Sequence, residues 1–330
     1  NHMSMVATKA AHLTRAAGDR PLLELGSRRT HIDAAVDAAV ASYIGGAVGT
    51  SNVEAHHRFA VPVVGTMDHF AVQSWESESS SVSDTEFAFF KAFATAYPQS
   101  ASLLVDTYDM FGEKTGIRNA VRAAAEADVQ LNGIRIDSQL SPQTVERARS
   151  LLDQLGAHHT KIIVSGGVDE PLIKTLKSSP VDIYGVGERL VTSADAPVGV
   201  GAVGKLSWID GITSMKQSRG SGKATLPGPI QAFRTDRRDR LSLVPSSPST
   251  DAQPLPWSFA WDSLPRHPEE RPLIHCVWRG EKALEERDQS TWLSTARTLR
   301  ARGCEEGLMR SVFVDDSLAE EMTRKCISRV

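Results

Sequence analysis

The sequence predicts an α/β protein in which parallel strands alternate with helices and close into an irregular βα barrel, with a C-terminal helical extension. From Pro21 to about Trp208, short apolar or β-branched runs alternate with amphipathic segments, which is the pattern of repeated βα units. The apolar runs show little alternation, as expected of strands covered on both faces. About seven such units favour a barrel. An open doubly wound sheet remains the alternative, because periodicity does not report closure.

The strands are predicted where the apolar runs are densest. They are expected at residues 22–26, 61–65, 102–108, 133–137, 161–165, 182–187 and 203–208.

Two of the intervening helices carry clear start and stop signals. Ser83 and Glu86 have the spacing of a capping box, and the helix that they begin ends at Pro98. Its shared apolar face consists of Phe90, Phe93 and Tyr97. A second helix begins at Ser141-Pro142, and Gly156 is placed to end it in the left-handed conformation. Its apolar stripe consists of Val145, Ala148, Leu152 and Leu155.

Composition shifts divide the chain into four expected parts. Residues 1–20 form an N-terminal helical remnant that begins with a tag-cleavage scar, Asn1-His2-Met3, and residues 21–240 form the barrel domain. Residues 241–256 are rich in Ser and Pro and are expected to be a linker. Residues 257–330 are charged and form a mixed, largely helical segment, with helices expected at 292–302 and 317–326.

The overall charge and hydropathy exclude several classes of protein. The chain carries 37 Lys plus Arg against 40 Asp plus Glu, a formal net charge of -3, which excludes a generally basic nucleic-acid coat. No window approaches the roughly 18 to 20 uninterrupted apolar residues of a membrane-spanning helix, and no secretory signal layout begins the chain. We therefore expect a cytoplasmic protein with neither nucleic acid nor membrane as its partner.

Polar and glycine residues cluster where the predicted strands end. In parallel βα folds these ends meet at one edge of the sheet and form the ligand site. The candidates at these positions are Glu24, Gly26, Arg28, Arg29, Gly65, Thr66, His69, Asp106, Asp109, Arg135, Asp137, Ser138, Ser165, Gly166, Gly167, Gly185 and Gly187.

Charged side chains interrupt two of the apolar runs. Asp106 follows Leu103-Leu104-Val105, and Arg135 and Asp137 flank Ile136. Burying a charge costs several kcal/mol unless it is paired or binds a ligand, so these residues predict a site at the barrel mouth. The alternative is a structural one, in which Arg135 pairs with Asp106 or Asp137 as part of the scaffold.

The two glycine pairs predict a phosphate site. Gly166-Gly167 and Gly185 with Gly187 let backbone amides approach an anion closely, although a single pair is equally typical of a tight βα connection. Two pairs on consecutive strands, facing Arg and Asp, favour a bound phosphate. His69 is placed to act as a nucleophile or proton carrier beside it, against the alternative of an ordinary hydrogen-bonded histidine.

Taken together and in order, these motifs resemble the nicotinate phosphoribosyltransferase family over nearly the whole chain. The matching segments are Ala7–Ala11, Glu24–Arg29, Tyr43–Gly46, Thr50–Asn52, Gly65–His69, Leu104–Asp109, Gly133–Ser138, Ile163–Gly167, Tyr184–Gly187, Lys205–Leu206 and Lys216–Arg234. The resemblance implies an irregular barrel of the type II phosphoribosyltransferase kind. It also implies transfer of phosphoribosyl from phosphoribosyl pyrophosphate to nicotinate or a related aromatic acid, giving nicotinate mononucleotide for NAD biosynthesis, commonly coupled to ATP hydrolysis.

The same resemblance implies roles for individual residues. Arg28 and Arg29 would face the pyridine carboxylate, and Thr50 and Ser51 would line the base pocket. His69 would be phosphorylated by ATP. The ribose and the Mg²⁺-pyrophosphate would be held by Asp106 and Asp137, with Arg135 beside the base and phosphates. The remaining substrate contacts would come from Ser138, Ser165, Gly166, Gly167, Gly185 and Gly187.

Two departures from the family pattern define the alternatives. The family carries an N-terminal domain before the segment matched by Ala7–Ala11, so we expect a homodimer or a heteromer with a separate subunit that resembles this domain. Asp137-Ser138-Gln139-Leu140 stands where the family has Asp-Ser-Gly-Asp-Leu. Both departures favour the alternative of a catalytically degraded homologue that serves as a binding or regulatory subunit. A specialised-metabolism ribosyltransferase with another acceptor is a further alternative, and nothing in the sequence names that acceptor.

Overall fold

The computed structural model describes residues 1–65, 67–76, 80–195, 203–210, 212–217, 224–235, 238–244 and 266–273, together with short strands at 278–279, 282–283 and 311–314. The chain forms two compact units, residues 1–200 with 288–301 and residues 201–287 with 302–330. The first unit therefore ends near residue 200, earlier than the boundary expected at residue 240.

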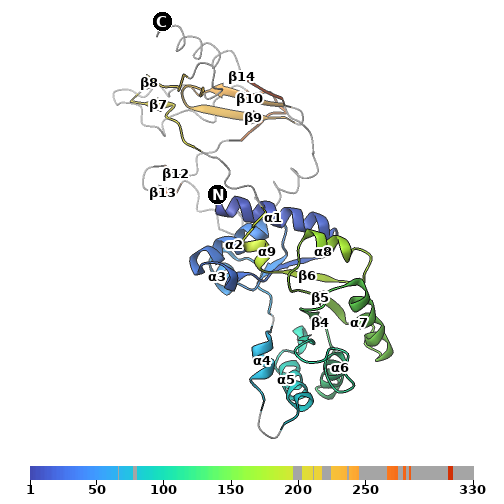
Figure 1. Ribbon diagram of the computed structural model, residues 1–330. Coiled ribbons are helices and arrows are strands. Elements are labelled where there is room, and N and C mark those ends of the chain that lie inside the picture. The colour runs from blue at the N-terminus through green and yellow to red at the C-terminus, as the bar shows by residue number, and fades with distance from the viewer. Residues whose placement is uncertain are drawn as a thin grey trace. The chain divides into compact units, whose positions relative to one another are not determined.

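The first unit is built on a six-stranded parallel sheet with the order β2-β1-β6-β5-β4-β3 (Figure 1). Its strands are β1 (Leu22–Glu24), β2 (Gly49–Thr50), β3 (Ser102–Leu104), β4 (Gly133–Ile136), β5 (Lys161–Val164) and β6 (Ile183–Val186). This curled parallel sheet confirms the predicted α/β class. The strand β2 was not expected, because a Gly-Thr pair carries almost no strand signal.

Val63 and Met67, which precede α4, each contact one of the two outer strands of this sheet. Val63 forms a parallel bridge with Thr50 of the edge strand β2. At the other edge, the backbone N–H of Leu104 in β3 donates to Met67 Sδ at 3.4 Å. The predicted strand 61–65 is thus present only as this single bridge.

The strand predicted at residues 203–208 is wrong. Residues 203–207 form no strand, and β7 (Trp208–Ile209) pairs antiparallel with β8 (Ile212–Thr213) in a separate two-stranded sheet. Val203 and Leu206 are 73% and 58% exposed. Their side chains are not buried in a barrel wall, and the position beside β2 is taken by the segment 61–68.

Helices follow most of the strands of the first unit. The α-helices are α1 (His2–Ala17), α2 (Ile32–Gly45), α3 (Val53–Phe59), α4 (His69–Gln73), α5 (Val82–Ala96), α6 (Ile117–Glu126), α7 (Pro142–Gln154), α8 (Glu170–Thr175) and α9 (Glu188–Val191). Two 3-10 turns are η1 (Ser27–Arg29) and η2 (Pro98–Ser100). Figure 1 shows α1 lying against α2, α8 and α9, which it contacts.

Helix α1 is held by an apolar face and by one buried cation. Val6, Ala10 and Leu13 are fully buried in the main hydrophobic cluster. Lys9, only 4% exposed, donates to Glu170 at the start of α8 at 2.5 Å and to Asp195 at 2.7 Å. The expected N-terminal helical segment is therefore an integral part of the first unit.

The start of α5 differs from its prediction. Its N-cap is Ser81, whose hydroxyl accepts from the backbone N–H of Asp84. Glu86 is fully buried and accepts from Gly116 and Asn119 of the α6 region instead of completing a capping box with Ser83. Helix α7 begins at Ser141-Pro142 as predicted, and Gly156 adopts the expected positive φ of 76°.

The core of the first unit lies between the sheet and its helices. The strands contribute fully buried Leu103, Leu104, Ile134, Ile136, Ile162, Val164, Tyr184 and Val186. Burial of each large apolar side chain stabilises the fold by about 1.5–3 kcal/mol. This core supports the strand ends from which the site is built.

The second unit contains a four-stranded mixed sheet with the order β11-β9-β10-β14. Its strands are β9 (Ile230–Arg234), β10 (Arg238–Leu243), β11 (Arg271–Pro272) and β14 (Ser311–Val314), and β12 (Trp278–Arg279) pairs with β13 (Lys282–Ala283). Residues 241–243 of the expected linker belong to β10. The remaining linker residues 245–256 and the helices expected at 292–302 and 317–326 lie outside the described residues.

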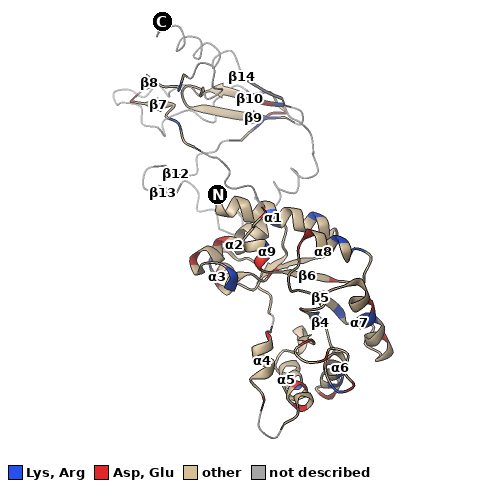
Figure 2. Cartoon of the chain, viewed as in Figure 1, with Lys and Arg blue, Asp and Glu red and all other residues tan. Residues whose placement is uncertain are grey.

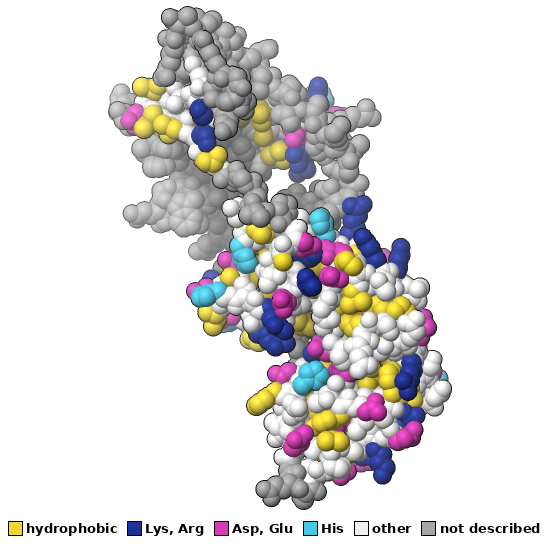
Figure 3. All heavy atoms as spheres, in the orientation of Figure 1, with side chains coloured by type: hydrophobic (Ala, Val, Ile, Leu, Met, Phe, Trp, Pro, Cys, Tyr) yellow, Lys and Arg dark blue, Asp and Glu magenta, His cyan; other side chains and the backbone are white. Residues whose placement is uncertain are grey.

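Charges of both signs are distributed over the first unit. Figure 2 shows Lys and Arg together with Asp and Glu on the same helices. On the face seen in Figure 3, positive and negative side chains alternate with small apolar patches.

Candidate active site at the carboxyl ends of the strands

A cavity of about 850 Å³ opens beside the carboxyl ends of the parallel strands. The sheet is parallel, so the loops that follow β1, β4, β5 and β6 meet at this edge. The predicted residues that line the cavity are Arg28, Arg29, Ser51, Arg135, Asp137, Ser165, Gly166, Gly167, Gly185 and Gly187.

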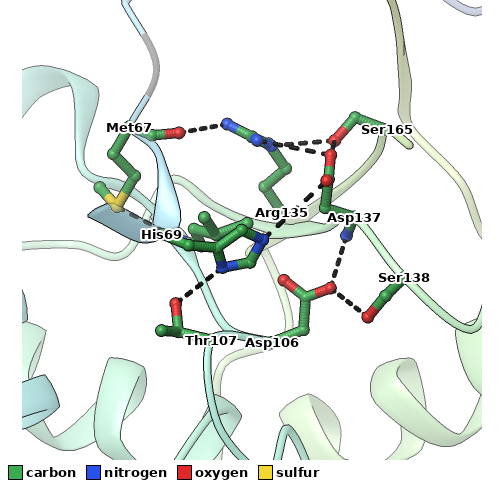
Figure 4. Close-up of polar contacts among 9 residues, drawn as sticks. Met67, His69, Asp106, Thr107, Arg135, Asp137, Ser138 and Ser165 are labelled. Atoms are coloured by element: carbon green, nitrogen blue, oxygen red, sulfur yellow. Dashed lines mark hydrogen bonds and ion pairs between the residues drawn. The ribbon is translucent and has the colours of Figure 1, made fainter. Parts of the chain in front are cut away.

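Arg135 connects three segments around this cavity (Figure 4). Its Nε donates to Ser165 Oγ at 2.9 Å, and its Nη1 donates to the Met67 carbonyl at 2.5 Å. Its Nη2 lies 3.4 Å from Asp137 Oδ1, which also accepts from Ser165 Oγ at 2.5 Å. The structural pairing of Arg135 with Asp137 is therefore present. Since both side chains line the cavity, the same pair also presents charge to a ligand.

Asp106 supports Asp137 from the neighbouring loop. Its Oδ2 accepts from the backbone N–H of Asp137 at 2.9 Å and from Ser138 Oγ at 2.6 Å (Figure 4). Its Oδ1 is buried and has no hydrogen-bond partner among the described residues. Asp106 and Ser138 lie next to Asp137 and do not line the cavity. Of the two carboxylates proposed as structural partners of Arg135, Asp137 is the one that pairs with it.

His69 begins helix α4 and lies beside the two carboxylates. Its Nδ1 is 3.1 Å from Thr107 Oγ1, and its Nε2 is 4.0 Å from Asp137 Oδ2 (Figure 4). The imidazole is 41% exposed. Asp68 Oδ1 accepts from the Ala71 N–H and caps α4. The three residues predicted to be catalytic are thus brought together.

The glycines serve different purposes at this edge. Gly166 has a φ of 88°, and a Cβ there would lie 1.8 Å from the Asp137 carbonyl oxygen. Gly167 has a φ of 66° with open space beside it. Gly185 packs against Leu25, where a Cβ would meet Cδ1 at 2.6 Å. The tight-connection interpretation therefore holds for Gly166 and Gly185, whereas Gly167 leaves room on the cavity side.

The residues expected around the acceptor ring divide into two groups. Arg28 and Arg29, both exposed, lie on η1 at the cavity, and Arg29 Nη1 is 3.3 Å from the Glu188 carboxylate. Ser51 also lines the cavity. Thr50 does not: it is fully buried, and its hydroxyl donates to Glu24 Oε2 at 2.5 Å. Thr50 is therefore not among the residues that line the cavity.

Three aromatic residues on α5 also line the cavity, and the sequence did not predict their place at the site. Phe89, Phe93 and Tyr97 contact one another in series, with ring centroids 6.1 Å and 5.0 Å apart. The apolar face that the sequence predicts for this helix includes Phe90, which is fully buried. Helical periodicity does identify Phe89 as the neighbour of Phe93, since they are four residues apart. It does not reveal that this face borders a cavity.

Within the described part of the chain, no group of three or more His, Cys, Asp or Glu side chains has the arrangement of a metal site. Mg²⁺ is commonly held by one or two carboxylates together with substrate phosphates, and the unpartnered Asp106 Oδ1 with the Asp137 carboxylate fits that donor set.

None of the helices in the described residues is long and apolar enough to cross a membrane.

Known proteins share this fold and sequence pattern. The chain is 43% identical over 237 residues to a nicotinate phosphoribosyltransferase of Mycobacterium tuberculosis, a match that covers 72% of this chain and 51% of that protein. A nicotinate phosphoribosyltransferase of Bacillus subtilis is 39% identical over 243 residues, with 71% and 47% covered. The chain thus spans about half the length of these relatives.

The solved structures agree with the fold. Human nicotinic acid phosphoribosyltransferase superposes with a TM-score of 0.73 at 24% identity, covering 98% of this chain and 74% of that one. Nicotinate-nucleotide pyrophosphorylase from Pyrococcus furiosus gives a TM-score of 0.61 at 23% identity, covering 92% and 70%. The family profile described as quinolinate phosphoribosyl transferase, C-terminal domain, matches residues 6–196, which include every strand of the parallel sheet. With this match across the barrel unit, the chain belongs to the quinolinate phosphoribosyl transferase family, and the resemblance to nicotinate phosphoribosyltransferases is confirmed.

Proposed function

We propose that this chain transfers phosphoribosyl from phosphoribosyl pyrophosphate to nicotinate or a related aromatic acid. The observation that carries the proposal is the group Arg135, Asp137 and Ser165, which borders a cavity of about 850 Å³ next to Gly166 and Gly167. In this reaction the ring nitrogen forms a bond to C1′ as the bond from C1′ to pyrophosphate breaks, and the pyrophosphate leaves with the electron pair.

The charges of the site suit that bond exchange. Positive charge develops on the ribose, and Asp137 with its supporting Asp106 supplies negative charge beside it. Negative charge develops on the pyrophosphate, and Arg135 offers a cation at the same rim. Mg²⁺ held by Asp106 and Asp137 would neutralise part of the pyrophosphate charge. The exposed guanidinium groups of Arg28 and Arg29 would bind the acceptor carboxylate.

ATP coupling through His69 is a second part of the proposal. The imidazole is partly exposed, and Thr107 holds one of its ring nitrogens. Phosphorylation of the ring by ATP would place a phosphate next to the donor site and tighten binding of the sugar substrate. The expected result for His69→Ala is loss of the ATP stimulation with basal transfer retained.

The test is direct formation of nicotinate mononucleotide by the full chain. Phosphoribosyl pyrophosphate, nicotinate and Mg²⁺ are supplied with and without ATP, and product is followed by chromatography. Asp137→Asn should lower kcat/KM about 10²-fold or more, because it removes the negative charge beside the ribose. The control variant is Lys91→Ala, which removes an exposed ion pair between Lys91 of α5 and Glu126 of α6. If no product forms with the chain alone or with each candidate partner added, the proposed activity is refuted.

One observation favours the alternative of a binding subunit without activity. Gln139 stands where the family pattern has glycine, and an aspartate of that pattern is absent. Binding of phosphoribosyl pyrophosphate without product would support this alternative. Product formed from a different aromatic acid, with nicotinate inert, would support a specialised-metabolism ribosyltransferase.

We also propose that a second subunit covers the apolar side chains beside the site, in the cytoplasm. Phe70, Trp75 and Tyr97 are 75%, 48% and 56% exposed. Exposed aromatic groups of this size are typical of interfaces, which supports a homodimer or a heteromer with a chain resembling the family's N-terminal domain. Sedimentation and copurification test this, and a monomer that is fully active would contradict it.

A further inference from the structure

Glu24 is a buried carboxylate that none of the proposed catalytic steps uses. It is the last residue of β1, it is 1% exposed, and its neighbour across the sheet is Thr50 of β2. Its Oε2 accepts from Thr50 Oγ1 at 2.5 Å, and its Oε1 accepts from the backbone N–H of Gly26. One carboxylate therefore joins two neighbouring strands to the turn that follows β1.

A second set of hydrogen bonds closes this connection into a ring. The Thr50 hydroxyl accepts from the backbone N–H of Asn52 at 3.0 Å, while Asn52 Nδ2 donates to Ser27 Oγ at 3.1 Å. Ser27 begins the 3-10 turn η1 that carries both arginines, and Asn52 follows Ser51. The two turns that border the cavity are consequently tied to each other at two points.

The burial of Glu24 is costly, and its hydrogen-bond partners are neutral. Burial raises the pKa of the Glu24 carboxyl, while hydrogen bonds from Thr50 and Gly26 act in the opposite direction. An apolar residue at the end of β1 would complete the core without this desolvation penalty. What an apolar residue does not provide is an acceptor for both Thr50 and Gly26, which is the geometric effect of the carboxylate.

We infer that Glu24 and Thr50 are a positioning pair that holds the turn 26–29 and the turn 50–52 in fixed relation and thereby sets the affinity for the acceptor's carboxylate. The inference rests on the proposed function, in which Arg28 and Arg29 bind that carboxylate and Ser51 lines the base pocket. It also assigns Thr50 a task that differs from lining the base pocket. The donor sugar phosphate, which faces Arg135 and Gly167, does not depend on this pair.

The variant Thr50→Val tests the pair in the full chain, since it keeps the shape of the side chain and removes the hydroxyl. We expect the KM and Kd for nicotinate to rise about tenfold, with kcat and the Kd for phosphoribosyl pyrophosphate changed by less than about threefold. Thr50→Ser restores the hydroxyl and should return the nicotinate affinity to nearly the wild-type value.

The matched control is Thr160→Val. Thr160 is 2% exposed, and its hydroxyl donates to the Leu131 carbonyl at 3.0 Å, just before the amino end of β5. The control removes a buried threonine hydroxyl at the amino-terminal end of the strands, away from the cavity, so it should change stability without changing nicotinate affinity. Equal losses for both ligands in Thr50→Val, or an unchanged nicotinate Kd, would overturn the inference.

Amide hydrogen exchange provides a readout that needs no ligand. Peptides containing 24–30 and 50–53 should exchange faster in Thr50→Val than in the wild type and Thr50→Ser, because Asn52 loses its acceptor. Unchanged exchange would overturn the tie between the two turns. If exchange accelerates but the wild-type chain binds no nicotinate, the proposed acceptor fails while the tie between the turns stands.

Discussion

At the scale of single residues, Asp137 connects the other polar residues of the site. Its carboxylate is shared by Arg135 and Ser165, and its backbone N–H is held by Asp106. The sequence identified these residues because a charge within an apolar run needs a partner or a ligand. It did not identify which charge pairs with which, because the partners come from different strands.

The backbone of Gly166 packs closely against the backbone of Asp137. A Cβ at this position would overlap the Asp137 carbonyl oxygen at 1.8 Å, and the φ of 88° adds backbone strain. We expect Gly166→Ala to destabilise the protein by about 3 kcal/mol. Gly167→Ala is the control, since it also has a positive φ but open space, and it should cost only about 1 kcal/mol. Urea denaturation measures both, and equal losses would show that the close contact is not limiting.

Gln139 is a non-glycine residue in the left-handed region, with a φ of 50°. The family pattern has glycine at the corresponding place, so the turn keeps its conformation at the cost of strain. Gln139→Gly should therefore raise the unfolding free energy by about 0.5–1 kcal/mol. Gln139→Ala keeps the strain and should give no gain. Thermal denaturation distinguishes them, and a stabilised Ala variant would contradict the explanation.

At the scale of elements, Glu86 links α5 to the start of α6. Its Oε2 accepts from the Gly116 N–H at 2.7 Å and from Asn119 Nδ2 at 2.9 Å, while Oε1 is buried with no partner among the described residues. Burial raises the pKa of the carboxyl to about 7, against the hydrogen bonds from Asn119 and Gly116. We therefore expect the pairing of these helices to depend on pH.

The sign of this dependence follows from proton binding. Between pH 4.5 and about 7 the unfolded chain releases the Glu86 proton while the folded chain keeps it, so the folded state loses stability as pH rises. The loss is about 3 kcal/mol by pH 8. Glu86→Gln should remove this slope and be the more stable protein at pH 8. Urea denaturation between pH 5 and 8.5 tests this, and parallel curves for both proteins would contradict it.

At the scale of the whole molecule, the first unit contains its own hydrophobic core. The buried cluster runs from Val6 to Val191, so every member lies before the boundary near residue 200. The four-stranded sheet of the second unit has its own buried residues, including Phe233 and Val244. Each unit is thus supported by contacts within its own part of the chain.

A fragment of residues 1–200 should accordingly fold by itself. We expect a cooperative urea transition and the helical circular dichroism of the βα unit, because the fragment retains all the described members of this core. A fragment that unfolds gradually, without a transition, would indicate that residues after 200 complete the core. The full chain, measured under the same conditions, is the reference.

The sequence by itself predicted the strands β1, β3, β4, β5 and β6, the α7 boundaries and the edge of the sheet where the charged residues gather. These features follow from local periodicity, capping and the parallel direction of the strands. Only the tertiary structure decided that Val63 pairs with Thr50, that Thr50 is bound to Glu24, and that Glu86 faces α6. The reason is physical: each depends on contacts between residues far apart in the chain, and no local pattern records which distant partner satisfies a buried polar group.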